Sequence, residues 1–212
     1  MAQAVGELTE QLPEVTRILG PDHPDTLVNR GNLAQWLGVL GDATQAVRML
    51  TESVASFARV EGPESRRTLA ARGALAYWQG HAGNAPESAR AFQDLLVDCR
   101  RVLGPNHPET LRTRIDLTYL QGQAGDTAGA VKACEELMVD LVRVLGPDHP
   151  DTLVNRRTLA FLQGEAGDPA RAAEAYADIL ADALRVLGPE HLETRTARRN
   201  LAYWLERAGI AD

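Results

Sequence analysis

The feature that most constrains this chain is a Gly-Pro dipeptide that recurs every 42 residues. The interval never changes, so no insertion or deletion separates one copy from the next. The copies are Gly20-Pro21, Gly62-Pro63, Gly104-Pro105, Gly146-Pro147 and Gly188-Pro189. A fixed period of this length is typical of solenoids, in which each repeat is one supersecondary unit that packs on its neighbours. The sequence therefore predicts a repeat array.

Each repeat predicts two helices. In the first, helix A, apolar residues such as Leu27, Leu33 and Leu37 recur at helical spacing over residues 24–40. A Gly-Asp turn follows, and a second amphipathic helix, helix B, covers residues 46–60. Helix B ends at Leu-Gly-Pro, because glycine can adopt a positive φ and proline cannot extend the helix. The proline and acidic residues that come next favour the start of the following helix A.

These helices predict an all-α fold, a right-handed αα superhelical solenoid of helix-turn-helix repeats in one array over residues 1–212. The boundaries follow the Gly-Pro register: a lone B helix in 1–19, full repeats in 20–61, 62–103, 104–145 and 146–187, and a lone A helix in 188–212. The second repeat departs most from the others, because Glu64-Ser65-Arg66 replaces the His-Pro element. A less regular entry into its A helix is expected.

The repeats resemble tetratricopeptide repeats, in particular the 42-residue variety of kinesin light chains and of many bacterial regulatory proteins. The resemblance rests on Asn-Leu-Ala at 32–34 and 200–202, on Gly-Asp or Gly-Asn before helix B, and on Leu-Gly-Pro-Asp-His-Pro at 19–24 and 145–150. It covers nearly the whole chain. It implies that the A helices line a concave groove and that the protein binds other proteins.

An arginine recurs in helix A of every repeat, and an invariant position of this kind is most simply explained by packing. We expect its aliphatic stem to pack between helices while its head group meets a carboxylate. The arginines are Arg30, Arg72, Arg114, Arg156 and Arg198. The candidate carboxylates, near the ends of B helices, are Asp98, Asp140 and Asp182, with Ser56 at the same position of the first repeat.

Other recurring residues also predict structural roles. Histidines occur once per repeat, and helix packing separates them by roughly 10 Å or more, so turn or capping roles are expected rather than a metal site. They are His23, His107, His149 and His191. A position for a large apolar group, expected to pack between helices, holds Trp36, Trp78, Leu120, Leu162 and Trp204. Cys99 and Cys134 lie at apolar positions of helix B and are expected to be unreactive.

The candidate binding surface is the face of helix A whose residues change between repeats. Tyr77, Tyr119, Phe161 and Tyr203 predict an aromatic ladder along the groove, and nearby arginines are expected to meet acidic groups of a partner. Two interpretations of the aromatic residues stay open, contact with a partner or packing between A helices. The full candidate set is Asn32, Gln35, Tyr77, His81, Arg112, Asp116, Tyr119, Arg157, Thr158, Phe161, Arg199, Asn200, Tyr203 and Arg207.

We expect a protein-interaction scaffold that binds a peptide or segment of a partner in this groove. One alternative is self-assembly, in which the lone terminal helix A packs head-to-tail on the lone starting helix B of another copy and gives homo-oligomers. Another is that the chain is the sensor arm of a larger signalling ATPase.

Several functional classes are disfavoured. A net charge of −7 argues against binding to nucleic acid, and no segment has the apolar length of a membrane span or the pattern of a signal peptide. A cytoplasmic location is expected. The motifs GxxxxGK[ST], HExxH and GxSxG do not occur, so we predict no enzyme, no cofactor and no metal site.

Overall fold

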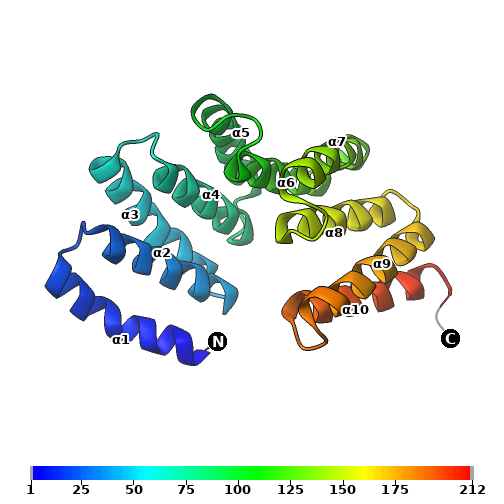
Figure 1. Cartoon of the computed structure of the whole chain (residues 1–212), viewed down its shortest axis with the longest axis horizontal. Helices are drawn as coiled ribbons and strands as arrows, with labels where there is room; N and C mark the ends of the chain where they lie inside the picture. The colour runs from blue at the N-terminus through cyan, green and yellow to red at the C-terminus, as the bar shows by residue number, and fades with distance from the viewer. Residues whose placement is uncertain (1, 211–212) are drawn as a thin grey trace. The chain divides into compact units, whose positions relative to one another are not determined.

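A computed structural model describes residues 2–210, and the side chains of residues 5–210. Within that range the chain forms ten α-helices and no β-strand, which confirms the predicted all-α fold (Figure 1). The helices are α1 (Ala2–Leu19), α2 (Pro24–Val39), α3 (Ala43–Glu61), α4 (Arg66–His81), α5 (Ala85–Val102), α6 (Pro108–Gln123), α7 (Thr127–Leu145), α8 (Pro150–Glu165), α9 (Pro169–Leu187) and α10 (Leu192–Arg207). Even-numbered helices are A helices and odd-numbered ones are B helices. None of the described helices is long and apolar enough to span a bilayer.

The helices form two compact units that divide within α6, Met1–Thr113 (unit 1) and Arg114–Asp212 (unit 2). In unit 1, consecutive helices from α1 to α5 pack on one another, and the A helices α2 and α4 also touch. In unit 2, α7 packs on α8, α8 on α9, and α9 on α10. The predicted ends at residues 1 and 211–212 lie outside the described range, and the single array over 1–212 stays a prediction.

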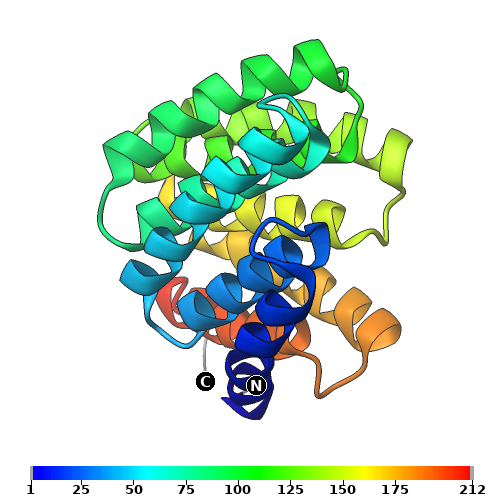
Figure 2. The same ribbon diagram turned by 90° about the vertical axis from the view of Figure 1, so that its left-hand side faces the viewer.

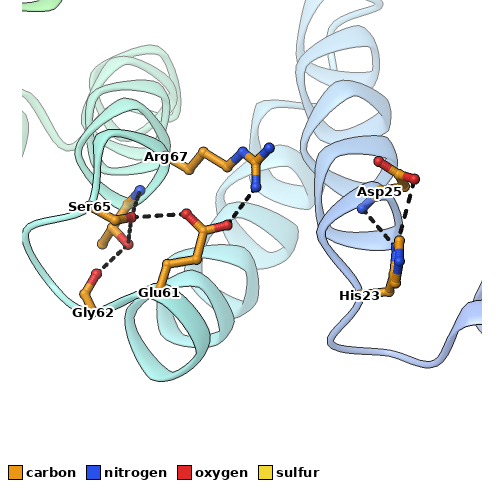
Figure 3. Close-up of polar contacts among 7 residues, drawn as sticks. His23, Asp25, Glu61, Gly62, Ser65 and Arg67 are labelled. Atoms are coloured by element: carbon orange, nitrogen blue, oxygen red, sulfur yellow. Dashed lines mark hydrogen bonds and ion pairs between the residues drawn. The ribbon is translucent and has the colours of Figure 1, made fainter.

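The histidines cap A helices, as predicted. Nδ1 of His23 accepts a hydrogen bond from the backbone amide of Asp25 at 3.2 Å (Figure 3). The other three histidines do the same at 3.1–3.2 Å. This bond satisfies one of the amides that a helix start leaves without a partner.

The second repeat enters its A helix as regularly as the others, so the expectation of a less regular entry was wrong. Helix α4 begins at Arg66, 42 residues after the start of α2. Ser65 replaces histidine as the cap, and its Oγ accepts the amide of Thr68 at 3.1 Å (Figure 3). Thr68 Oγ1 donates to the carbonyl of Gly62 at 2.8 Å, a bond that recurs in the three following repeats. Gly62 itself has φ of 95°, which explains the glycine there.

The predicted arginine–aspartate pairs form between A and B helices. The Nη1–Oδ2 distance is 2.7 Å for Arg72–Asp98, 2.8 Å for Arg114–Asp140 and 2.6 Å for Arg156–Asp182. A second arginine, three residues further along each B helix, donates to the same carboxylate. In each pair the guanidinium groups hold the pKa of the aspartate below its ordinary value of 3.8, most strongly the one from helix A. The recurring arginine thus ties the two helices of a repeat together.

The large apolar position packs on a glycine of the preceding A helix. A Cβ on Gly38 would lie 2.5 Å from the ring of Trp78, and one on Gly164 would lie 2.5 Å from the ring of Trp204. Leu162 packs on Gly122 in the same way. Such approaches require glycine, because any side chain would push the two A helices apart. The prediction of packing is confirmed for these residues, whereas Trp36 is 38% exposed.

Candidate functional site: the seams between A helices

A pocket of about 170 Å³ lies between the A helices α2 and α4 of unit 1. Its floor is helix α3, from which the buried residues Leu50, Ser53 and Phe57 face the pocket. Its walls are mostly small or aliphatic residues; those from α2 include Leu27, Val28 and Gly31, and those from α4 are Arg67, Ala70, Ala71 and Ala74. The short side chains on both walls leave an apolar groove between the helices, which we call the α2–α4 groove.

Gly31 keeps this groove open. A Cβ added to Gly31 would meet no atom within 4 Å, so the space above it is free. The equivalent Gly73, one repeat later, has less room, because its Cβ would lie 3.4 Å from Leu95 and 3.7 Å from Glu109. The space above Gly31 is therefore more open than the space above Gly73.

Polar side chains line the rim of the groove. Asn32 and Gln35 are exposed on α2, and each offers both amide donors and a carbonyl acceptor. Arg67 lies on the opposite wall, half-exposed, with its guanidinium 2.7 Å from the carboxylate of Glu61 (Figure 3). A bound segment would therefore meet an apolar floor and hydrogen-bonding groups at the edge.

The corresponding seam of unit 2, between α8 and α10, is filled. Arg157 stands where unit 1 has Gly31, and its Nη1 forms a close ion pair with Glu193, which stands where unit 1 has Arg67. The hydroxyl of Tyr176, buried beneath, donates to the carbonyl of Arg157 at 3.1 Å. Burial raises the pKa of Tyr176 to about 12, so this donor stays protonated.

The aromatic residues divide between the two interpretations. Phe161 is half-buried, with its ring centroid 6.4 Å from that of Tyr119 and 6.0 Å from that of Trp204, so it packs between A helices of unit 2. Tyr77 and Tyr203 are 39% and 46% exposed, each edge-on to the neighbouring tryptophan of its own helix. Only these two present a face to solvent of the kind that a partner would contact.

Of the other candidates, several are engaged within the chain. Arg207 donates to Glu165 and to the hydroxyl of Tyr203, both at 2.9 Å. Thr158 is buried and donates to its own helix, and Asn200 is half-buried beside Tyr176. The rings of His81 and Tyr77 lie 4.4 Å apart in unit 1, tilted by 57°. Asp116 is half-buried, and Arg112 and Arg199 are exposed.

Asn32 and Gln35 of the groove are among the residues predicted from the sequence, whereas Gly31 is not. The available signal was that the position of Gly31 holds glycine in two repeats and Ile115, Arg157 or Arg199 in the others. Among the described residues, no group of three His, Cys, Asp or Glu is placed to hold a metal ion.

The structure defines the class of protein as an α-helical repeat scaffold. Its units of helix A and helix B recur with a 42-residue period, with histidine caps on most A helices and arginine–aspartate pairs between A and B helices. The tetratricopeptide repeat family model matches residues 68–109 and 110–151. The two matched segments are therefore tetratricopeptide repeats, and repeats of this type support a role as a protein-interaction scaffold.

Solved structures share the fold. A protein of Podosopora anserina, described as a kinesin light chain with nearly identical TPR-like repeats, is 24% identical with a TM-score of 0.65, over 88% of this chain and 89% of that one. BtubC (BKLC) from P. vanneervenii is 15% identical with a TM-score of 0.73, over 99% and 84%. A Rap protein complexed with competence and sporulation factor is 13% identical with a TM-score of 0.61, over 97% and 59%. No curated protein sequence matches the chain significantly.

Proposed function

We propose that this protein is an interaction scaffold that binds a segment of a partner protein in the α2–α4 groove. The observation that carries the proposal is the free space above Gly31, over an apolar floor and beside exposed amides. An extended segment would place one aliphatic side chain in the hollow. Its backbone would exchange hydrogen bonds with Asn32 and Gln35.

The size of the groove favours a peptide over a small molecule. Pockets that enclose drug-sized ligands or cofactors hold about 300–1,000 Å³, whereas this hollow is about 170 Å³. That volume suits a single apolar anchor of a longer chain whose remainder lies along the A helices. A Rap protein of the same fold has been solved in complex with competence and sporulation factor, which supports a binding role for this fold.

The proposal places the binding site away from most of the residues that the sequence alone favoured. In unit 2, Arg157 and Arg207 already pair with Glu193 and Glu165. A partner would have to break these pairs before it gained anything from either arginine. The sensor arm of a signalling ATPase stays a prediction.

The test uses peptides selected from a random display library on the whole protein, with dissociation constants measured by fluorescence polarisation. Gly31→Leu fills the hollow, and we expect it to weaken binding about ten-fold or more. Since leucine favours helix more than glycine does, by about 0.5–1 kcal/mol, the fold should not suffer.

The matched control is Gly6→Leu on α1, where an added Cβ also meets no atom within 4 Å. It should leave the affinity within about two-fold. Equal affinity of the wild type and Gly31→Leu for every selected peptide would contradict the proposal.

A further inference from the structure

Where the large residue of an A helix is tryptophan, its contact with the preceding A helix has the same chemistry in both units; where it is Leu162, the glycine is kept as Gly122 and Thr118 replaces the alanine. An alanine and a glycine four residues apart on one A helix face the large residue of the next: Ala34 and Gly38 meet Trp78, and Ala160 and Gly164 meet Trp204. In the first case Leu50 of the intervening B helix completes the cluster. These two contacts serve as the template, that is, as the observed way in which an A helix of this chain packs on such a tryptophan.

The surface that this template would cover is open at α1 and α2. Helix α1 is the outermost helix of unit 1, and Figure 2 views the unit with α1 in front. Trp36, the equivalent of Trp78, is 38% exposed, and Val39 beside it is 51% exposed. Leu8 of α1, the equivalent of Leu50, is half-exposed, whereas Leu50 is buried. A shallow pocket of about 260 Å³ is lined by Asn32, Gln35, Trp36 and Val39.

We infer that this α1–α2 face binds an α-helix that presents alanine and glycine four residues apart, with the glycine against Trp36. The partner is defined by that pair, because an added Cβ on the glycine of either tryptophan contact inside the chain would lie 2.5 Å from the ring, and the residue four positions before that glycine is alanine in both. The inference does not depend on binding in the α2–α4 groove, although Asn32 and Gln35 border both surfaces.

Helix α10 of a second copy of this chain does not match the required helix. In α10 the alanine is kept as Ala202, but the glycine position holds Glu206. A glutamate there would push its carboxylate into the indole of Trp36, burying a charge without a partner. The head-to-tail stacking considered from the sequence is therefore disfavoured, and a different helix is the expected occupant.

The probe is a peptide copy of α8, residues 150–165, acetylated and amidated, which carries Ala160 and Gly164 and contains no tryptophan. It is titrated into the whole protein by isothermal calorimetry, up to millimolar concentration because isolated short helices are marginal in water. Saturable binding is expected. The matched peptide with Gly164→Glu, which copies the situation of α10, should bind about ten-fold more weakly or worse.

Two protein variants locate the peptide. Trp36→Ala should lose about ten-fold or more in affinity while its thermal unfolding stays near that of the wild type, and Gly31→Leu should bind the α8 peptide within about two-fold of the wild type. The inference is overturned if the α8 peptide shows no saturable binding, if both peptides bind equally, or if Trp36→Ala binds as the wild type does. Loss of binding in Gly31→Leu with retention in Trp36→Ala would also overturn it, because the peptide would then occupy the groove.

Discussion

Unit 1 leaves open two surfaces that unit 2 fills. Between α2 and α4, Gly31 leaves a hollow, whereas between α8 and α10 the equivalent Arg157 crosses the seam to Glu193. Trp36 stands 38% exposed on α2, whereas its equivalent Trp204 is 1% exposed against Gly164. Two units built from the same kinds of helix and turn therefore differ in what they offer a partner: the two seams differ in their side chains, whereas Trp36 is exposed because no described A helix packs on its side of α2.

The contrast shows that stability and recognition are carried by different positions of one repeat. The arginine–aspartate pairs and the glycine contacts recur in both units and hold helices together. The positions of Gly31 and Arg67 vary without disturbing the helices around them. A repeat array can therefore change its binding surface while its stacking stays constant.

The largest expected effect separates the covered tryptophan from the uncovered one. Trp204→Ala should destabilise the protein by about 3–5 kcal/mol, because it empties a fully packed site. Trp36→Ala, the same substitution at the same repeat position, should cost less, about 1–2 kcal/mol, since its ring is partly in water. Urea denaturation measures both. Equal losses would break the comparison between the two units.

Exchanging the seam residues should give effects of opposite sign. Arg157→Gly should destabilise by roughly 1–2 kcal/mol, because it removes a partly exposed ion pair and places glycine inside a helix. Gly31→Arg should stabilise by about 0.5–1 kcal/mol through helix propensity alone. Thermal unfolding of the two single variants tests this, and a loss of stability in Gly31→Arg would show that the space above α2 is not free.

Acid should weaken the arginine–aspartate pairs. The pKa values of Asp98, Asp140 and Asp182 are lowered in the folded protein by their guanidinium partners, below the ordinary 3.8. The contribution of these three ion pairs to the free energy of unfolding is therefore complete above about pH 5. It is lost as pH falls below the ordinary aspartate pKa and then through the lower pKa of the folded protein. The free energy of unfolding should fall over this window. The triple Asp→Asn variant should be less stable at pH 7 and show a flatter acid dependence; an unchanged slope would exclude these pairs as its cause.

The smallest expected effect concerns the two thiols, one in each unit. Burial raises the pKa of Cys99 and raises that of Cys134 to about 12. At pH 8 both should react with a disulfide reagent far more slowly than a free thiol, and Cys134 should react only when unit 2 opens. Mass spectrometry of labelled peptides reads the two sites separately, and labelling of either cysteine at the rate of a free thiol would contradict its burial.

The sequence predicted the parts of the molecule that repeat. The alternation of A and B helices, the histidine caps and the pairing of Arg72 with Asp98 all followed from residues that recur at a 42-residue period, because a contact made identically in each repeat leaves an identical pattern. Helix α3 begins at Ala43, three residues before the predicted start of helix B. The second repeat was misjudged because Ser65 caps a helix as well as histidine does.

The sequence could not predict which variable residues stay available. Arg157 and Glu193 are 36 residues apart, so their pairing depends on the distance between A helices of successive repeats. The hollow over Gly31 depends on that same distance. A second pattern in the sequence marks the contacts between A helices, but its meaning became clear only from the structure. Glycine recurs inside helix A at Gly38, Gly80, Gly122 and Gly164 and is replaced by Glu206.

The central claim is that the α2–α4 groove is the binding site and that residues of the α8–α10 seam would close it. The double variant Gly31→Arg with Arg67→Glu transplants the Arg157–Glu193 pair of unit 2 into unit 1. Its affinity for a peptide selected on the wild type, measured by fluorescence polarisation, tests the claim most directly. We expect affinity to fall by about ten-fold or more while thermal stability is kept. A double variant that stays folded and binds the peptide with wild-type affinity would contradict the account.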